Sequence, residues 1–217
     1  MLKKNTYILY MGIVRIKKED NYKYALWKIE EKLEDLLATL NPTEKELSEI
    51  QKFRNKKRQK QNIAARLTLN TLGEGKIKLY YTKTGRPKCL GFDNISISHS
   101  YEYCIVIVSK YPIGIDIQYK NSNIIKLSSK FINSQEKQGL ENINDIEKLH
   151  FIWCAKEAIY KTLNNEFCSF KKNIYINPKT NKTETTGLFQ KRNKKINYKI
   201  YYEKLEDYFI SIAKEKI

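Results

Sequence analysis

The stretch YCIVIVSKYPIGIDIQY, residues 103–119, decides how the chain is organised. Tyr103–Ser109 and Ile113–Tyr119 are apolar runs of strand length, rich in β-branched residues, and each predicts a buried strand. Lys110-Tyr111-Pro112 separates the two runs, and the proline favours a hinge because its ring fixes the backbone. We therefore expect the chain to divide near Tyr111 into two parts.

On the N-terminal side, helical and alternating patterns follow one another. Tyr7–Ile16 alternates and predicts a strand, whereas Tyr22–Leu40 carries apolar residues at helical spacing and predicts a helix. Thr43 and Glu46 stand three residues apart, as in a capping box, and predict the start of helical structure that ends near Gly73. The elements expected after it are strands at Ile77–Tyr81 and Ile95–Ser98, with a turn at Gly85-Arg86-Pro87 between them.

On the C-terminal side, the same order of helices and then strands recurs. The expected helices are Ile124–Lys130 and Asp145–Leu163, and the expected strands are Ile174–Ile176, Lys199–Tyr202 and Tyr208–Ala213. The sequence therefore predicts an α+β fold in two similar halves, residues 1–111 and 112–217.

Composition fixes the broad class of protein. The 217 residues are 41% hydrophobic and 12% aromatic, which is enough to form a core and excludes a chain that is disordered throughout. No apolar run approaches the roughly 20 residues of a membrane helix, and the N-terminus has no signal-peptide cleavage site. We expect a cytoplasmic protein without a membrane partner. The four cysteines are spaced too widely for a chelating pair and are expected to be free, buried thiols.

The charge is strongly basic, because 41 Lys and Arg against 24 Asp and Glu give +17. Such a charge attracts polyanions and acidic partners. The cations are mostly lysines scattered among Asn, Ile and Tyr, as a compositional bias would also produce, and no zinc-finger, RRM or KH motif is present. A solvated basic surface and a docking surface for an acidic protein or a phosphate-rich ligand are both open.

Three segments hold residues that could do chemistry. In Asn94–Ser100, small hydroxyls surround His99, a combination that suits an anion, with a structural histidine as the alternative. In Ile113–Gln118, Asp116 lies between isoleucines, where an unpaired carboxylate is costly, so it must bind a metal or form a structural ion pair. Gly114 indicates that a ligand or another backbone comes close.

The third segment lies on the helix expected at residues 145–163. Trp153, Glu157 and Lys161 are four residues apart and share one face, with Lys156 close to it. An exposed Glu–Lys pair is the simple interpretation, but the tryptophan indicates a largely buried helix, where an acid and a base point to function. His150, one turn earlier, is expected to serve packing or to lie at the surface.

Four motifs, namely Gly85-Arg86-Pro87, Ser98-His99-Ser100, Gly114-Ile115-Asp116-Ile117 and Trp153-x-x-Lys156-Glu157-Ala158-x-x-Lys161, occur in this order and spacing. Together, over residues 81–161, they resemble the 4′-phosphopantetheinyl transferases of the surfactin-synthetase-activating type. The resemblance implies two pseudo-symmetric α/β halves with coenzyme A and Mg²⁺ in the cleft between them. It also implies the activity of a holo-[acyl-carrier-protein] synthase, in which a carrier-protein serine attacks the β-phosphate of coenzyme A and adenosine 3′,5′-bisphosphate leaves.

The same resemblance gives the site residues their tasks. Asp116 and Glu157 would ligate Mg²⁺, Lys161 would hold the pyrophosphate, and Glu157 or a metal-bound water would take the serine proton. Ser98 and His99 would contact the phosphate region of coenzyme A. The remaining contacts implied are Lys83, Gly85, Arg86 and Pro87 with the adenosine end, and one of Lys52, Arg54, Lys57 or Arg58, preferably Lys57, with the 3′-phosphate.

Two positions depart from the pattern of many relatives. Gln118 stands where a third metal-site carboxylate is common, and it could ligate Mg²⁺ directly or through water, so we expect weaker Mg²⁺ binding but retained activity. Ser96 replaces a more usual Asn, which puts a ligand contact in question. The expected partners are coenzyme A and an acidic acyl- or peptidyl-carrier protein, and both half-sites in one chain favour a monomer.

Two other functions stay open on the sequence alone. A basic nucleic-acid-binding protein would show salt-sensitive binding and would need neither Asp116 nor Glu157. An inactive coenzyme A-binding homologue would have lost catalysis with the missing carboxylate at position 118.

Overall fold

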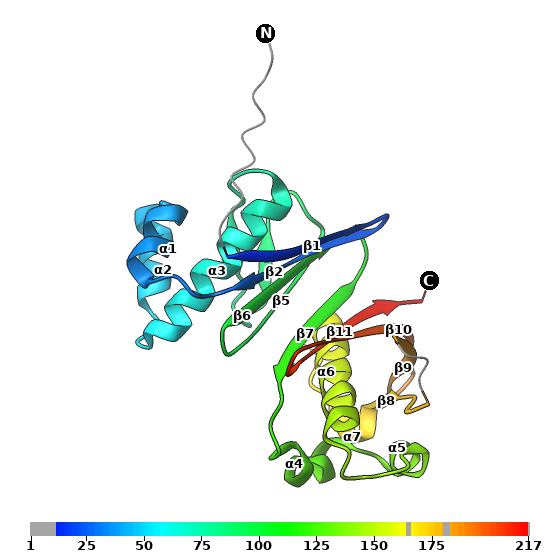
Figure 1. Cartoon of the computed structure of the whole chain (residues 1–217). Helices are drawn as coiled ribbons and strands as arrows, with labels where there is room; N and C mark the ends of the chain where they lie inside the picture. The colour runs from blue at the N-terminus through cyan, green and yellow to red at the C-terminus, as the bar shows by residue number, and fades with distance from the viewer. Residues whose placement is uncertain (1–11, 164–165, 180–182, 217) are drawn as a thin grey trace.

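The structure is a computed structural model that describes residues 12–163, 166–179 and 183–216. Two large antiparallel sheets and one two-stranded sheet make up its β structure. The first large sheet has the order β1 (Ile13–Glu19), β2 (Tyr22–Lys28), β6 (Tyr103–Ser109), β5 (Asn94–Ser100). The second has the order β7 (Ile113–Tyr119), β11 (Tyr208–Glu215), β10 (Lys194–Leu205), β9 (Glu184–Lys191), β8 (Ile174–Ile176). The small sheet pairs β3 (Leu79–Tyr81) with β4 (Pro87–Cys89). The described residues thus have the predicted α+β class (Figure 1).

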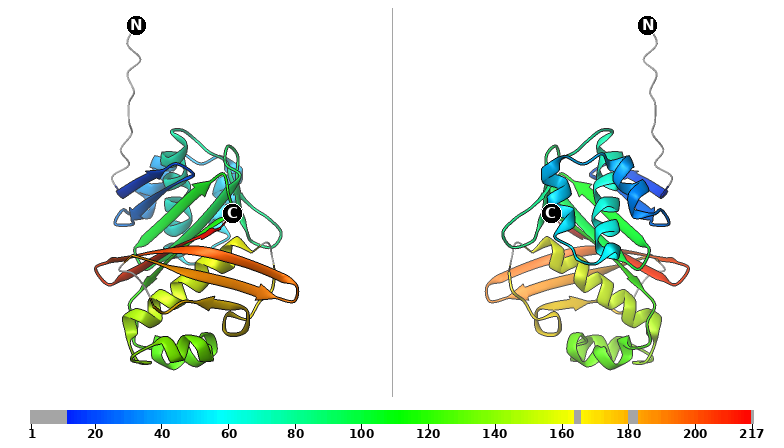
Figure 2. Two further views of the ribbon diagram at one scale, coloured as in Figure 1. Left: turned by 90° about the vertical axis from the view of Figure 1, so that its right-hand side faces the viewer. Right: turned by 90° about the vertical axis from the view of Figure 1, so that its left-hand side faces the viewer.

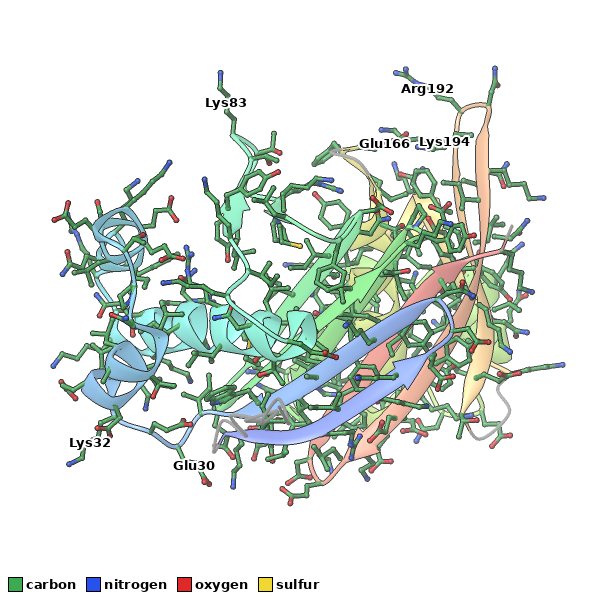
Figure 3. The ribbon with its side chains drawn as sticks, turned by 90° about the horizontal axis from the view of Figure 1, so that it is seen from above. Glu30, Lys32, Lys83, Glu166, Arg192 and Lys194 are labelled. Carbon is green, nitrogen blue, oxygen red and sulfur yellow. The ribbon has the colours of Figure 1, made fainter. Side chains whose placement is uncertain are left out.

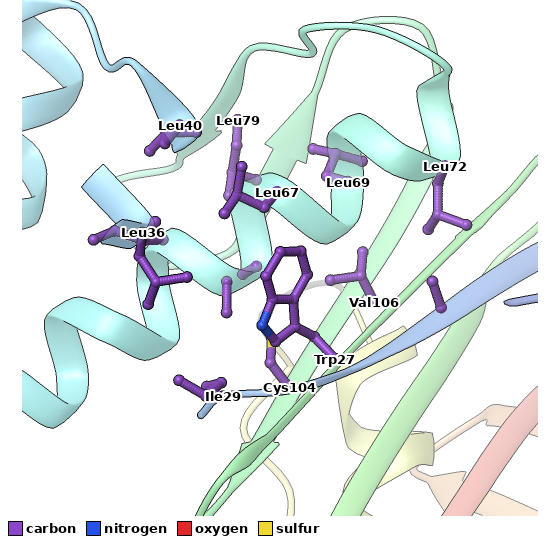
Figure 4. Packing of buried hydrophobic residues seen from close by; sticks show 14 of the residues in the cluster. Trp27, Ile29, Leu36, Leu40, Leu67, Leu69, Leu72, Leu79, Cys104 and Val106 are labelled. Carbon is purple, nitrogen blue, oxygen red and sulfur yellow. The ribbon is translucent and has the colours of Figure 1, made fainter. Parts of the chain in front are cut away.

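One hydrophobic core lies between the first sheet and its helices. α3 (Lys56–Gly73) packs on β2 and β6, while α1 (Leu33–Leu40) and α2 (Glu44–Gln51) pack against α3. Trp27 is 1% exposed and is surrounded by aliphatic side chains from α1, α3 and β6 (Figure 4). Burial of an aromatic side chain of this size is one of the largest single apolar contributions to stability.

The strand β2 corrects the expectation of one helix over Tyr22–Leu40. The four residues Tyr24–Trp27 are all buried, because β2 lies between β1 and β6 and is covered on both faces. Such a strand needs apolar residues at consecutive positions, and a continuous apolar run also contains helical spacings. Only α1 within this stretch is helical. Of the strand expected at Tyr7–Ile16, residues 7–11 lie outside the described part of the chain.

The predicted capping box is confirmed at the start of α2. The Thr43 hydroxyl accepts from the Glu46 amide, and the Glu46 carboxylate accepts from the Thr43 amide. The helical structure does not run unbroken to Gly73, since residues 52–55 lie between α2 and α3, and the Asn55 side chain caps the new helix. The basic run at 52–60 is therefore divided between this break and the start of α3.

A second hydrophobic core lies between the second sheet and α6 (Ile146–Thr162). Asp145 caps this helix by accepting from two amides of its first turn, which confirms the helix predicted at 145–163. α4 (Ile124–Phe131) is also confirmed, and α7 (Phe170–Asn173) precedes β8. α5 (Ser134–Gly139) and β9 are additions that sequence reasoning missed. α5 has little apolar character, and of the buried positions of β9, Thr185, Gly187 and Phe189, only the last is a large apolar residue.

The two large sheets face each other through a third hydrophobic cluster. It takes buried side chains from β2 and β6 on one side and from β7 and β11 on the other. The layers are therefore helix, sheet, sheet and helix, with α3 and α6 on the two outsides (Figure 2). At one end of this sheet pair, the edge strands β5 and β7 lie side by side. This place, the joint between the sheets, holds the residues considered next.

All four cysteines are free and buried, as predicted. Within the three described ranges, no helix has both the length and the apolar character needed to span a bilayer.

Candidate functional site

The joint between the sheets is made by serine side chains. β5 and β7 share no backbone ladder, so the outer edge of β7 offers amides that need acceptors. Alternate serines of β5 supply them. The amides of Ile115, Ile117 and Tyr119 donate to the hydroxyls of Ser96, Ser98 and Ser100, at 3.1, 3.3 and 2.9 Å respectively. Ser96, whose role was in question, is thus a structural partner of β7.

Asp116 of β7 lies at the centre of this joint and is 2% exposed. Its Oδ1 accepts from the Ser98 hydroxyl at 2.6 Å and from the Lys161 ammonium at 2.7 Å. Its Oδ2 accepts from the Gln118 side-chain amide at 2.7 Å. The sequence required something to neutralise this carboxylate, and in the structure Lys161 of α6 does so. Lys161 also donates to the carbonyl of Ile115 at 2.8 Å.

Gly114 explains how α6 comes so close to β7. A Cβ atom at this position would lie 1.9 Å from the carbonyl oxygen of Ala158, an atom of the helix backbone. Of the two alternatives that the sequence left open for Gly114, a ligand or another backbone, the structure supplies the backbone. This close approach carries Glu157 and Lys161, the residues beside Ala158 and one turn beyond, to the Asp116 strand.

We expect Gly114→Ala to destabilise the protein by about 1–3 kcal/mol, the usual cost of overpacking. The added methyl group would meet backbone, which has no rotamer that relieves the clash. Thermal unfolding measures this effect. Gly75→Ala is the matched control, because nothing lies within 4 Å of its added Cβ. An equal melting temperature for both variants would contradict the close packing.

Glu157 is a half-buried carboxylate without a hydrogen-bond partner in the described part of the chain. Burial, and to a smaller extent the charge of Asp116, raise the pKa of Glu157 to about 7, although Lys161 opposes both. Asp116 of β7 and Glu157 of α6 therefore repel each other here. The single positive charge of Lys161 does not balance the two negative charges. Such a pair favours a cation, because the cation removes the repulsion and satisfies free oxygens.

The donor set at the joint fits one hard divalent cation. Asp116 and Glu157 offer carboxylate oxygens. The Gln118 amide nitrogen binds Asp116, and its carbonyl oxygen has no hydrogen bond from any residue that the structure describes. Oxygen ligands with few carboxylates are what Mg²⁺ takes, with waters completing its coordination. No group of three acidic, histidine or cysteine residues gathers anywhere in the described ranges, in keeping with an amide at position 118.

A basic residue of α3 meets His99 on the same strand as Ser98. Nη1 of Arg58 lies 3.0 Å from Nε2 of His99. Burial lowers the pKa of His99, and the charges of Arg58 and Lys161 lower it further, so the ring is neutral at pH 7 and accepts from the guanidinium. Lys57, preferred from the sequence, instead lies over the ring of Tyr101 at 4.6 Å. The structure thus brings Arg58, rather than Lys57, to His99.

The turn Gly85-Arg86-Pro87 is brought toward the joint in part. Arg86 and Pro87 line a small cavity of about 50 Å³ together with Lys161 and Thr162. Gly85 has a φ of +79°, which the turn requires and which glycine adopts without strain. Lys83, at the tip of this β3–β4 hairpin, is exposed and points away from the rest of the molecule (Figure 3). The structure does not bring Lys83 to the other candidate residues.

Lys156 lies elsewhere, so the expectation that it lies close to the face of Glu157 is wrong. Its ammonium is fully buried and binds Glu136 at 2.8 Å. It also donates to the backbone carbonyls at the end of α4, at the start of α7 and at the start of β8. One residue along a helix turns the side chain by about 100°, which is enough to send it into the C-terminal core. Trp153 also packs there, against Phe131 and Phe170.

His150 serves packing, which is one of the two alternatives that the sequence left open. It is buried, and both ring nitrogens make hydrogen bonds.

Comparison with known proteins decides which family this arrangement is related to. Residues 112–213 match the family model described as the 4′-phosphopantetheinyl transferase superfamily. The matched segment is slightly less than half of the chain, and it is this segment that is similar to the superfamily. A 125-residue stretch is also 28% identical to the 4′-phosphopantetheinyl transferase Gsp of Aneurinibacillus migulanus, covering 56% of this chain and 51% of that protein. The match therefore spans about half the length of this distant relative.

We call Asp116, Ser98, Gln118, Glu157 and Lys161 the Asp116 cluster. All of these residues except Ser98 lie inside the segment that matches the superfamily. Sequence reasoning missed the structural tasks of Ser96 and Ser100. A signal for them was present, since serines at every second position of β5 must share one edge or face of a strand. What it lacked was the knowledge that β7 would lie beside them.

Proposed function

We propose that this protein transfers the 4′-phosphopantetheine arm of coenzyme A to a serine of an acyl- or peptidyl-carrier protein. The superfamily match of residues 112–213 supports the reaction class. The observation that carries the proposal is the meeting of Asp116 and Glu157, from β7 and α6, beside Lys161. Two under-neutralised carboxylates next to an ammonium suit the binding of a cation together with a diphosphate.

In this proposal Asp116 and Glu157 hold Mg²⁺, with Gln118 contributing its carbonyl oxygen directly or through water. When bound, Mg²⁺ neutralises charge on the diphosphate of coenzyme A. Lys161, whose ammonium donates to Asp116 in the structure, directs another of its N–H groups at that diphosphate. The carrier serine oxygen forms a bond to the β-phosphorus, its proton passes to the Glu157 carboxylate, and the bond to adenosine 3′,5′-bisphosphate breaks.

The N-terminal half would bind the rest of coenzyme A. Arg58, next to the neutral ring of His99, is the basic residue that we assign to the 3′-phosphate, in place of Lys57. Arg86 and Pro87, which share a cavity with Lys161, would contact the adenosine end together with Gly85. Lys83 would reach it only after the hairpin tip moves, because its side chain points outward.

Two features support the division into halves 1–111 and 112–217 and the pseudo-symmetry between them. Each half has its own hydrophobic core between a sheet and a long helix, and the third cluster lies between the halves. The net charge of +17 supports an acidic carrier protein as partner, because opposite charges speed encounter. We further propose that the chain works as a monomer, since both half-sites lie in one chain, and that it works in the cytoplasm.

The test is to incubate the full chain with coenzyme A, Mg²⁺ and an apo carrier protein, and to measure the carrier's mass. We expect the mass of one phosphopantetheine arm to be added to one serine. Binding of coenzyme A without a mass change for any carrier type would indicate an inactive homologue. A salt-sensitive DNA or RNA mobility shift without transfer would indicate the nucleic-acid-binding alternative.

A further inference from the structure

We propose that Ser98 is a positioning residue that fixes the Asp116 carboxylate from the other half of the protein. The inference rests on the proposed function, in which Asp116 holds a divalent cation. Ser98 is in β5 of the first sheet, and Asp116 is in β7 of the second. Their hydrogen bond, at 2.6 Å, crosses the joint between the sheets.

The Ser98 hydroxyl has two tasks at once. It accepts from the Ile117 amide, which fixes the oxygen against β7. A hydroxyl has a single hydrogen, and once its oxygen accepts this amide, the hydrogen is free to be aimed at Asp116 Oδ1. Ser96 and Ser100 make the first kind of bond to β7 but none to a carboxylate of the described residues. Ser98 is therefore distinguished from two chemically identical neighbours by its contact with Asp116 alone.

The other two donors to Asp116 are less able to hold it during a reaction. Lys161 has a long flexible stem, its side chain is 24% exposed, and in the proposed reaction it turns toward the diphosphate. Gln118 lies on the same strand as Asp116 and is half-buried. Its amide nitrogen binds Asp116, and in the proposed site its carbonyl oxygen would turn to the cation. Ser98 has a short side chain on a strand that the first sheet holds in place. It keeps the carboxylate oriented while the other donors change partners.

This contact also couples the two halves of the site. Ser98 precedes His99, which meets Arg58, so one strand of the N-terminal half contacts both the expected phosphate residues and the expected cation carboxylate. A shift of β5 relative to β7 would therefore move both subsites together. Orientation of a metal-ligating carboxylate by an outer hydrogen bond typically changes metal affinity by about 10–100-fold.

The experiment compares Ser98→Ala with Ser96→Ala in the full chain, and measures Mg²⁺ binding by titration calorimetry without coenzyme A or carrier. Each variant removes one hydroxyl that accepts a β7 amide, so both should lower the melting temperature, Ser98→Ala by more because it also removes a donor to the buried Asp116 carboxylate. Only Ser98→Ala should weaken Mg²⁺ binding, by about 10-fold or more. Ser98→Thr, which keeps the hydroxyl, should restore most of the affinity.

The outcomes separate this proposal from the function on which it rests. Equal Mg²⁺ affinities for Ser98→Ala, Ser96→Ala and the unchanged chain would overturn the positioning role and leave the function intact. Equal losses in both variants would also overturn it, because the effect would then come from strand contact in general. If Ser98→Ala does not fold, a Ser98→Thr chain that folds but binds Mg²⁺ as weakly as a Glu157→Gln chain overturns it. The role is also excluded if transfer by the unchanged chain requires Mg²⁺ and the Ser98→Ala chain keeps the same transfer rate and the same Mg²⁺ affinity.

Discussion

Replacing Glu157 with glutamine is expected to lower the rate of phosphopantetheine transfer on the order of 10³-fold, the scale of losing one main electrostatic contact in a transition state. Glutamine keeps the size of the side chain but removes the charge that holds the cation and the base that accepts the serine proton. The measurement is the rate at which an apo carrier protein gains mass. Glu147→Gln is the matched control, because Glu147 lies on the same helix but pairs with Lys204 at the surface.

The same variant is expected to make the metal-free protein more stable at pH 8. The folded-state pKa of Glu157, about 7, lies above its ordinary value of 4.5. The folded protein therefore holds this proton more tightly than the unfolded chain does. The stability that the protonated group contributes is complete below pH 4.5 and is lost as the pH rises through 7. Glutamine avoids this loss, which we put at about 1–2 kcal/mol after allowing for solvent at a half-buried group.

Thermal unfolding without metal tests the stability effect. The Glu157→Gln chain should melt a few degrees above the unchanged chain at pH 8, and the difference should shrink toward pH 4.5. Addition of Mg²⁺ should stabilise the unchanged chain and leave the variant as it was. A variant that melts lower than the unchanged chain at pH 8 would mean that Glu157 already has a good partner. Unreduced transfer by the variant would remove Glu157 from the mechanism.

Replacing Gln118 with glutamate is expected to strengthen Mg²⁺ binding on the order of 10²-fold. A unit charge at about 4 Å is worth about 4 kcal/mol at an effective dielectric of 20, and partial exposure reduces that figure. In the metal-free protein the change has the opposite effect. It replaces the amide that donates to Asp116 Oδ2 with a second negative charge, so the melting temperature should fall.

Calorimetric Mg²⁺ titration and thermal unfolding test the Gln118 prediction together. The expected pair of results is tighter binding and a larger Mg²⁺-induced rise in melting temperature. Gln138→Glu in α5 adds the same charge at an exposed position outside the Asp116 cluster and should change neither. Equal Mg²⁺ affinity of the Gln118→Glu chain and the unchanged chain would show that position 118 does not face the cation.

Much of the fold could be predicted where local pattern decides the structure. β6 and β7 were predicted with the bounds that the structure has, because each is an apolar strand bounded by a turn. The residues that cap α2 follow from short-range hydrogen bonding and were just as accessible. β2 was mistaken for a helix because a strand buried on both faces loses the alternation that identifies strands.

The candidate site was predictable in its residues but not in its contacts. The spacing of Glu157 and Lys161 places them on one helix face, and their meeting with Asp116 followed from the resemblance. The serine bonds of the joint join strands of different sheets, and no local pattern reports which strands become neighbours. For the same reason the choice between Lys57 and Arg58 depended on where His99 would lie.

In the proposed site, Asp116 and Glu157 together coordinate one divalent cation at the joint between the sheets. The most direct test is a crystal of the full chain soaked with Mn²⁺ and coenzyme A, with anomalous scattering recorded for manganese. We expect a single strong anomalous peak between the two carboxylates, next to the diphosphate. A well-ordered diphosphate with no peak between Asp116 and Glu157, or with the metal bound elsewhere, would contradict the claim.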